Sequence, residues 1–377
     1  MRRALGWLLL VACAKDDADA DPPSSTDTSA STTDDGAPES GATSFSSTSG
    51  RIDTSAGSSS SDGSTGTDPS VLPGCPEVRA ETDLADDSSD PQVRVLYVIP
   101  SDSVDDELDL DGRICSSTLG WTQWLLDQTG GRRLRLDTSG DVLDIGFVRL
   151  EVTDAVMHGS SPEPDVETGF AYVRDRIERE LLQMGMLAPH KIYAVYYGGT
   201  SEYSCGGGSY PPLIVDQVGA MYLGGQIPGF PACDEQPWGE ADLVPRYIDY
   251  GMLHEIMHTL GLVDPLAPHE HASGHAFDDG EADPQRDLLY SQRAGMDDPD
   301  WGVYEPGGLL LDLGRDDYFE QPGATIVDLS RSVFLEPMPP DATFPPGWSR
   351  DAPPSPAIEL RRPLFPPVTG AWAARSR

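Results

Sequence analysis

The chain has 377 residues, enough for one large domain or two ordinary ones, and its formal net charge is −38. It holds 25 Lys and Arg residues against 63 Asp and Glu residues, which excludes a nucleic-acid partner, because phosphate recognition needs clustered cations. This acidity is typical of an exported protein kept soluble by charge repulsion, and we expect a monomer.

The first residues predict an export signal. Arg2 and Arg3 precede a short apolar run at 4–12, which is too short to span a bilayer. The run ends in Leu10-Val11-Ala12-Cys13, which resembles the lipobox of bacterial lipoproteins, and this resemblance implies that Cys13 carries a lipid. The alternative is a plain secretory signal. We expect an exported bacterial lipoprotein at the outer membrane, at the cell surface or in the periplasm, or one that is released outside the cell. Only the lipid anchor would contact the membrane.

Composition divides the rest of the chain into three parts. Residues 14–70 are rich in Ser, Thr and Asp and almost lack aliphatic side chains, so they predict a disordered linker. Residues 71–335 carry the periodic patterns of a folded catalytic domain. From 336 to 377 prolines crowd the sequence, which indicates an irregular arm or tail.

The folded part alternates strand and helix patterns. Strands are expected at 93–100, 133–137, 145–152 and 191–197, and helices at 114–128, 170–186 and around 247–260. Gly206-Gly207-Gly208 lacks the strand–turn–helix context of a phosphate loop, so we interpret it as a flexible turn in a loop-rich stretch. The fold class is mixed α/β (α+β), with a sheet of about four or five strands.

One motif dominates this pattern, His254-Glu255-Ile256-Met257-His258. Two histidines four residues apart lie on one face of a helix, where both can reach a zinc ion at about 2.0–2.1 Å. Glu255 lies one residue round the helix, where a general base for an attacking water belongs. Gly261 provides the left-handed stop that ends a helix.

A five-residue motif also occurs by chance on surface helices. Here the helix that carries the motif is apolar on its other faces, which is typical of a buried helix. A buried helix normally lacks polar residues, so the two histidines and the glutamate need a reason to be there. The chain has seven histidines, and five of them fall between residues 254 and 275. Both observations favour a metal site over core histidines satisfied by hydrogen bonds.

From about Gln92 to Phe334 the chain resembles the metzincin clan of secreted zinc peptidases. The motif continues to Gly261 at the metzincin spacing, and Asp264 stands where snapalysin-like members have their third ligand. The resemblance implies a zincin domain with one catalytic Zn²⁺ and a protein or peptide substrate.

The third zinc ligand is left open by this resemblance. Matrixin-like members have a third histidine followed by Asp and then a Met-turn, and His275, Asp278 and Asp287-Leu288-Leu289-Tyr290 reproduce that order. His275 is therefore the first candidate, with Asp264 and His269 as alternatives. Leu289 replaces the methionine of the turn, and the resemblance makes Tyr290 a candidate to assist the oxyanion.

Four cysteines remain beyond Cys13, and none has C-x-x-C spacing. In an exported protein an even number favours disulfides, for which three connectivities exist. We expect Cys205–Cys233, closing the glycine-rich loop, and Cys75–Cys115, anchoring the start of the domain.

Asp312, Asp316 and Asp317 are candidate ligands for a structural Ca²⁺, although their spacing matches no EF-hand loop. Together the patterns predict an exported zinc-dependent endopeptidase with Glu255 as general base. The alternative is a surface binding or adhesion module that keeps the fold without turnover.

Overall fold

The computed structural model describes residues 70–158, 166–201, 204–211, 214–226, 232–240, 242–271, 274–276, 284–290, 308–321 and 327–348. These residues belong to one compact unit. The predicted signal with Cys13, nearly all of the linker and the end of the tail lie outside this range. Within it, no helix combines the length and the apolarity needed to cross a bilayer.

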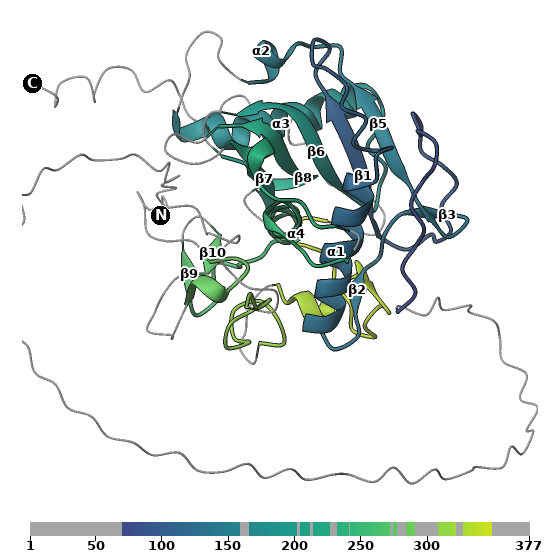
Figure 1. Ribbon diagram of the computed structural model, residues 1–377. Helices are drawn as coiled ribbons and strands as arrows, with labels where there is room; N and C mark the ends of the chain where they lie inside the picture. Colours follow the sequence, from purple (N-terminus) through teal and green to yellow (C-terminus); the bar gives the residue numbers. More distant parts are fainter. Residues whose placement is uncertain are drawn as a thin grey trace, which may run out of the picture. The chain divides into compact units, whose positions relative to one another are not determined.

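A five-stranded mixed sheet forms the centre of the domain (Figure 1). In spatial order its strands are β5 (Ile145–Arg149), β1 (Gln92–Ile99), β6 (Lys191–Ser201), β8 (Ile214–Gly225) and β7 (Gly206–Tyr210). The first four run parallel, and β7 pairs with β8 antiparallel at the edge. Every residue of β1 is buried, which is why its sequence is almost continuously apolar.

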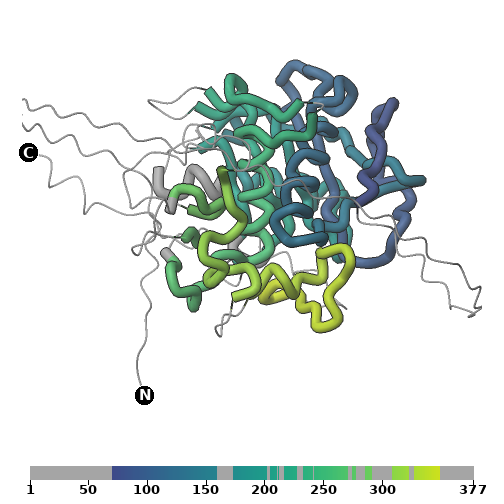
Figure 2. The backbone as a smooth tube through the Cα atoms, turned by 60° about the horizontal axis from the view of Figure 1, so that its bottom comes forward, coloured from purple at the N-terminus to yellow at the C-terminus, as the bar shows by residue number. Residues whose placement is uncertain are grey.

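Helices cover both faces of the sheet. Side chains of α3 (Val166–Gln183) pack with alternate residues of β6 and β8 on one face. On the other face, α1 (Arg113–Gln128) and α4 (Tyr247–Thr259) form the larger core with the rest of the chain. Figure 1 shows α4 nearly end-on beside α1, and Figures 1 and 2 both show the C-terminal segments, drawn in yellow, at one end of the domain.

The structure confirms the predicted helices and most predicted strands, with small shifts of their ends. The interpretation of Gly206-Gly207-Gly208 as a flexible turn is wrong, since these residues form β7. The long strand β8 was also missed within the stretch interpreted as loop-rich. Every second residue of this part of β8, namely Val218, Ala220 and Tyr222, packs into the same core, which is a strand pattern. The many glycines nearby obscured it in the sequence.

Short elements complete the domain. The predicted strand 133–137 is reduced to β2 (Arg133–Leu134), which pairs outside the main sheet with β11 (Leu335–Glu336). Beyond β11 the chain is irregular but still packed, and the ring of Trp348 lies 5.6 Å from that of Phe334. The remaining elements are α2 (Asp154–Met157), β3 (Thr138–Ser139), β4 (Val142–Leu143), β9 (Glu270–His271), β10 (His275–Ala276) and three short 3-10 turns, η1 (Cys233–Glu235), η2 (Pro284–Arg286) and η3 (Leu329–Arg331).

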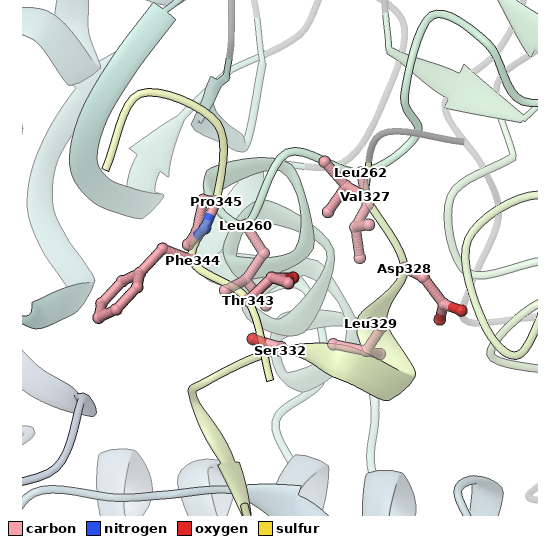
Figure 3. A pocket seen from close by; sticks show the side chains of 9 residues that line it. All are labelled: Leu260, Leu262, Val327, Asp328, Leu329, Ser332, Thr343, Phe344 and Pro345. Carbon is pink, nitrogen blue, oxygen red and sulfur yellow. The ribbon is translucent and has the colours of Figure 1, made fainter. Parts of the chain in front are cut away.

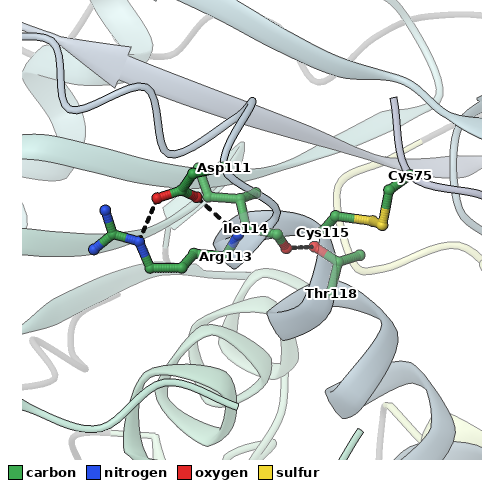
Figure 4. The surroundings of a disulfide bond; sticks show 6 residues. All are labelled: Cys75, Asp111, Arg113, Ile114, Cys115 and Thr118. Carbon is green, nitrogen blue, oxygen red and sulfur yellow. Dashed lines mark hydrogen bonds and ion pairs between the residues drawn. A yellow bond between two sulfur atoms is a disulfide. The ribbon is translucent and has the colours of Figure 1, made fainter. Parts of the chain in front are cut away.

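Two disulfides are present, with the expected pairings. Cys75–Cys115 joins the start of the domain to the first turn of α1, as Figure 4 shows. Cys205–Cys233 joins the residue before β7 to η1. Their Cα–Cα distances, 5.7 and 5.5 Å, lie in the ordinary range for disulfides.

Candidate metal centre

Helix α4 carries the two histidines of the motif, and all of its residues are buried. Asp249 in its first turn accepts a hydrogen bond of 2.7 Å from the backbone N–H of Arg246, which satisfies one of the free donors at the helix start. The helix lies directly on β7 and β8. Because Gly208 and Gly219 have no side chain, the backbone of Glu255 can approach these strands closely.

Three imidazole rings converge beside α4. The Nε2 atoms of His254 and His258 lie 2.9 Å apart, and the Nε2 atom of His275 lies 3.2 Å from each of them. His275 comes from the short strand β10, and it is partly buried. We call these three residues the histidine triad.

The other ring nitrogens show which tautomers are present. The Nδ1 atoms of His254 and His258 each lie 2.8 Å from a backbone carbonyl oxygen, those of Leu288 and Leu262 respectively. A carbonyl only accepts hydrogen bonds, so each Nδ1 carries the proton and donates it. The Nε2 lone pairs of both rings are therefore left to face the centre of the triad.

This arrangement fits a zinc ion. Tetrahedral coordination at about 2.0–2.1 Å places two nitrogens roughly 3.3 Å apart, close to the spacing of the triad. Burial lowers the pKa of His254 well below its usual range, and burial lowers the pKa of His258 to about 4. Both rings are thus neutral at physiological pH, which is the form that binds metal.

A tight turn, Asp287–Tyr290, supports two members of the triad. The carbonyl of Leu288 receives the hydrogen bond from His254, as described above. The carbonyl of Leu289 accepts a hydrogen bond of 2.8 Å from the backbone N–H of Ala276, the neighbour of His275. The turn therefore fixes the orientation of one ring and the backbone position of another.

Glu255 lies on the sheet side of the triad and is 5% exposed. A Cβ placed on Gly206 would collide with its carboxylate, so the side chain of Glu255 lies against β7. The sequence analysis missed this contact. The signal for it was the glycine run itself, which marks a strand that another element approaches closely.

Asp264 is not in the group of side chains whose ligand atoms converge at the triad, and its carboxylate has a structural role. One of its carboxylate oxygens accepts from the backbone N–H of Leu266, and the other from that of Val327, both at 2.7 Å. These bonds close a turn and attach it to the C-terminal segment. The structure does not bring Asp264 together with the triad.

His269 belongs to a second group, in which it lies near Asp316 and Asp317, and we call these three residues the His269 cluster. Asp317 accepts hydrogen bonds from the backbone N–H of His269 at 2.8 Å and from its Nδ1 at 3.0 Å. The proposed calcium trio is not assembled as expected, because Asp312 instead accepts from the backbone N–H groups of Tyr318 and Phe319.

Tyr290 ends the tight turn and forms an isolated bridge with Ala276, which places it beside β10. It is 8% exposed. Leu289, which the sequence resemblance places at the Met-turn position, is fully buried in the core and accepts a hydrogen bond from the backbone N–H of Ala276, beside His275. A leucine of similar volume can fill such a position.

A small hollow beyond the end of α4 is lined by Leu260, Leu262, Val327 and neighbouring residues (Figure 3). The space that a water-sized sphere can enter measures only about 10 Å³. This is room for about one water molecule.

Comparisons with known proteins add little. No family model matches the chain, and no curated protein matches it. Among solved structures, archaemetzincin from Methanopyrus kandleri is similar at 11% identity and a TM-score of 0.27, over 48% of this chain and 81% of that one. Catalytically inactive OgpA from Akkermansia muciniphila, in complex with an O-glycopeptide substrate, is similar at 13% and 0.28, over 52% and 53%.

A chaperone–substrate complex is similar to about the same degree, at 16% identity and a TM-score of 0.26, over 59% of this chain and 33% of that one. Scores this low do not establish a common fold.

Proposed function

We propose that this protein is an exported, zinc-dependent endopeptidase of the metzincin type. His254, His258 and His275 bind the zinc ion, and Glu255 is the general base. The observation that carries the proposal is the convergence of three Nε2 atoms within 3.2 Å of one another beside a buried glutamate. Lipidation of Cys13 would hold the enzyme at the outer membrane or cell surface.

Bound zinc supplies Lewis acidity, which polarises a peptide carbonyl and makes a water molecule nucleophilic near neutral pH. Glu255 takes the proton from that water as it attacks the scissile carbonyl carbon. Glu255 then donates the proton to the nitrogen of the leaving amine. Tyr290, beside β10, is the candidate to stabilise the oxyanion that develops on the carbonyl oxygen.

The edge of the sheet supports a peptide substrate. Among the described residues, β7 is the edge strand of the sheet and pairs with β8. An extended peptide can add to such an edge through main-chain hydrogen bonds. Because Glu255 lies against β7, a peptide bound there would pass next to the general base.

The test is cleavage of an unbiased peptide mixture by the purified protein, beside its Glu255→Ala variant and beside wild type treated with a chelator. We expect Glu255→Ala to keep its zinc and to lose about 10²–10⁴ in rate, the usual contribution of a positioned general base. We expect the chelator to abolish cleavage and added zinc to restore it.

Full activity of Glu255→Ala would refute the mechanism. Zinc bound without any cleavage would instead favour the binding module considered from the sequence. A folded protein that binds no zinc would refute the metal centre itself.

A further inference from the structure

Asp287 is a buried carboxylate that the proposed chemistry does not use. It is 3% exposed and opens the tight turn that supports the triad. Burial, together with the negative charge of Asp312, raises its pKa well above the usual value. Keeping such a group inside the domain costs free energy unless its oxygens accept several hydrogen bonds.

Both oxygens of Asp287 are engaged. Oδ1 accepts from the backbone N–H of Leu289 at 2.7 Å and from the hydroxyl of Tyr318 at 2.9 Å. Oδ2 accepts from the backbone N–H of Leu313 at 2.7 Å. The carboxylate therefore closes the turn on itself and attaches it to the segment 308–321.

The tight turn holds two members of the histidine triad in place. The carbonyl of Leu288, between Asp287 and Leu289, receives the proton of His254 Nδ1. The carbonyl of Leu289 receives the backbone N–H beside His275. Rotation of the Leu288 peptide group would move the acceptor of the His254 ring, and rotation of the Leu289 peptide group would shift the backbone beside His275.

We propose that Asp287 is a positioning residue for the zinc site, acting through the Leu288 and Leu289 carbonyls on His254 and His275. Tyr318 is its partner and fixes the direction of the carboxylate. The inference rests on the proposed function, since it assumes that the triad binds zinc. Groups that orient metal ligands in this way are commonly worth 10–100-fold in metal affinity.

The experiment measures zinc affinity of the full chain by competition with a chromophoric chelator, and the visible spectrum of the Co²⁺-substituted protein. The test variant is Asp287→Asn, which can accept only part of the three hydrogen bonds. The matched control is Asp154→Asn. Asp154 also accepts from a backbone N–H, a threonine hydroxyl and a tyrosine hydroxyl, but these hold Thr200 and Tyr197 rather than the turn.

We expect both variants to unfold at lower denaturant concentration. Only Asp287→Asn should bind zinc about 10–100-fold more weakly and change the Co²⁺ spectrum, which reports ligand geometry. If Asp287→Asn does not fold, Tyr318→Phe removes one of the three hydrogen bonds and should weaken zinc binding at least about threefold.

The inference is overturned if the folded Asp287 variant, or Tyr318→Phe in its place, binds zinc as wild type does with an unchanged spectrum. It is overturned equally if the control variant loses as much affinity as the test variant. Wild type that binds no zinc would overturn the proposed function as well, so the two failures are distinguishable.

Discussion

The histidine triad and the His269 cluster lie close together in the sequence but use their imidazoles differently. In the triad, His254 and His258 donate from Nδ1 to backbone carbonyls, which leaves both Nε2 lone pairs facing a common centre. In the His269 cluster, Nδ1 and the backbone N–H of the same residue both point at one carboxylate, that of Asp317.

The difference shows that the partner of one ring nitrogen decides what the other can do. A carbonyl fixes the tautomer and orients the ring without adding charge, and such contacts commonly support metal-bound histidines. A carboxylate that also accepts the backbone N–H instead joins two loops, 264–269 and 312–320. The same residue type is a proposed metal ligand in one place and connects two loops in the other.

The largest expected effect compares one histidine from each group. We expect His275→Ala to lose most of its zinc, because it removes one of three ligands. His269→Ala should keep roughly one zinc per chain and lose about 1–3 kcal/mol of stability, since Asp317 is left without its ring partner. Zinc content of the two purified proteins by elemental analysis measures this. Retention of zinc by His275→Ala with loss in His269→Ala would reverse the assignment.

A smaller effect is expected from the strand beneath the triad. A Cβ on Gly208 would lie 2.6 Å from the backbone oxygen of Glu255 and 2.7 Å from the Cβ of His258. Gly208→Ala should therefore displace α4, cost about 1–3 kcal/mol of stability and lower peptidase activity.

The control for Gly208→Ala is Gly74→Ala, a glycine outside the main sheet whose added Cβ would meet Val142 at an ordinary 3.8 Å. It should change stability by no more than about 0.5 kcal/mol. Denaturant unfolding and peptide cleavage, measured on both variants, would contradict the close approach of α4 if the two behaved alike.

The smallest and most gradual effect is the pH dependence of the unfolding free energy that Asp312, near the His269 cluster, contributes. Burial raises the pKa of Asp312 to about 7. A pKa that is higher in the folded protein than in the unfolded chain means that the folded protein binds the proton more tightly. This contribution to stability is complete below about pH 4 and is lost as the pH rises to about 7, in total about 2–4 kcal/mol.

Asp312→Asn should flatten the fall in unfolding free energy between these pH values. Asp328→Asn, which changes a less buried carboxylate that caps η3, is the matched control for the substitution itself. Urea unfolding at a series of pH values measures both. Equal slopes for wild type and Asp312→Asn would show that Asp312 is ionised in the folded domain throughout.

Much of the fold followed from local sequence patterns. The apolar run of β1, the helical spacing of α1 and α3, and the stop at Gly261 were each visible without the structure. Strands β7 and β8 were not, because glycine has low strand propensity and its reason for being there lies in α4, far along the chain. The close approach of α4 to these glycines joins residues far apart in the sequence, so no local sequence pattern reveals it.

The sequence by itself determined that His254 and His258 share one helix face with Glu255 beside them, since helix geometry depends only on spacing. Only the tertiary structure decided which third residue joins them. His275 lies 17 residues beyond His258, and its position depends on the path of the intervening loop and on the turn at Asp287. Long-range packing placed His275 at the triad and gave Asp264 and His269 to other partners, because backbone hydrogen bonds from distant segments fixed each loop.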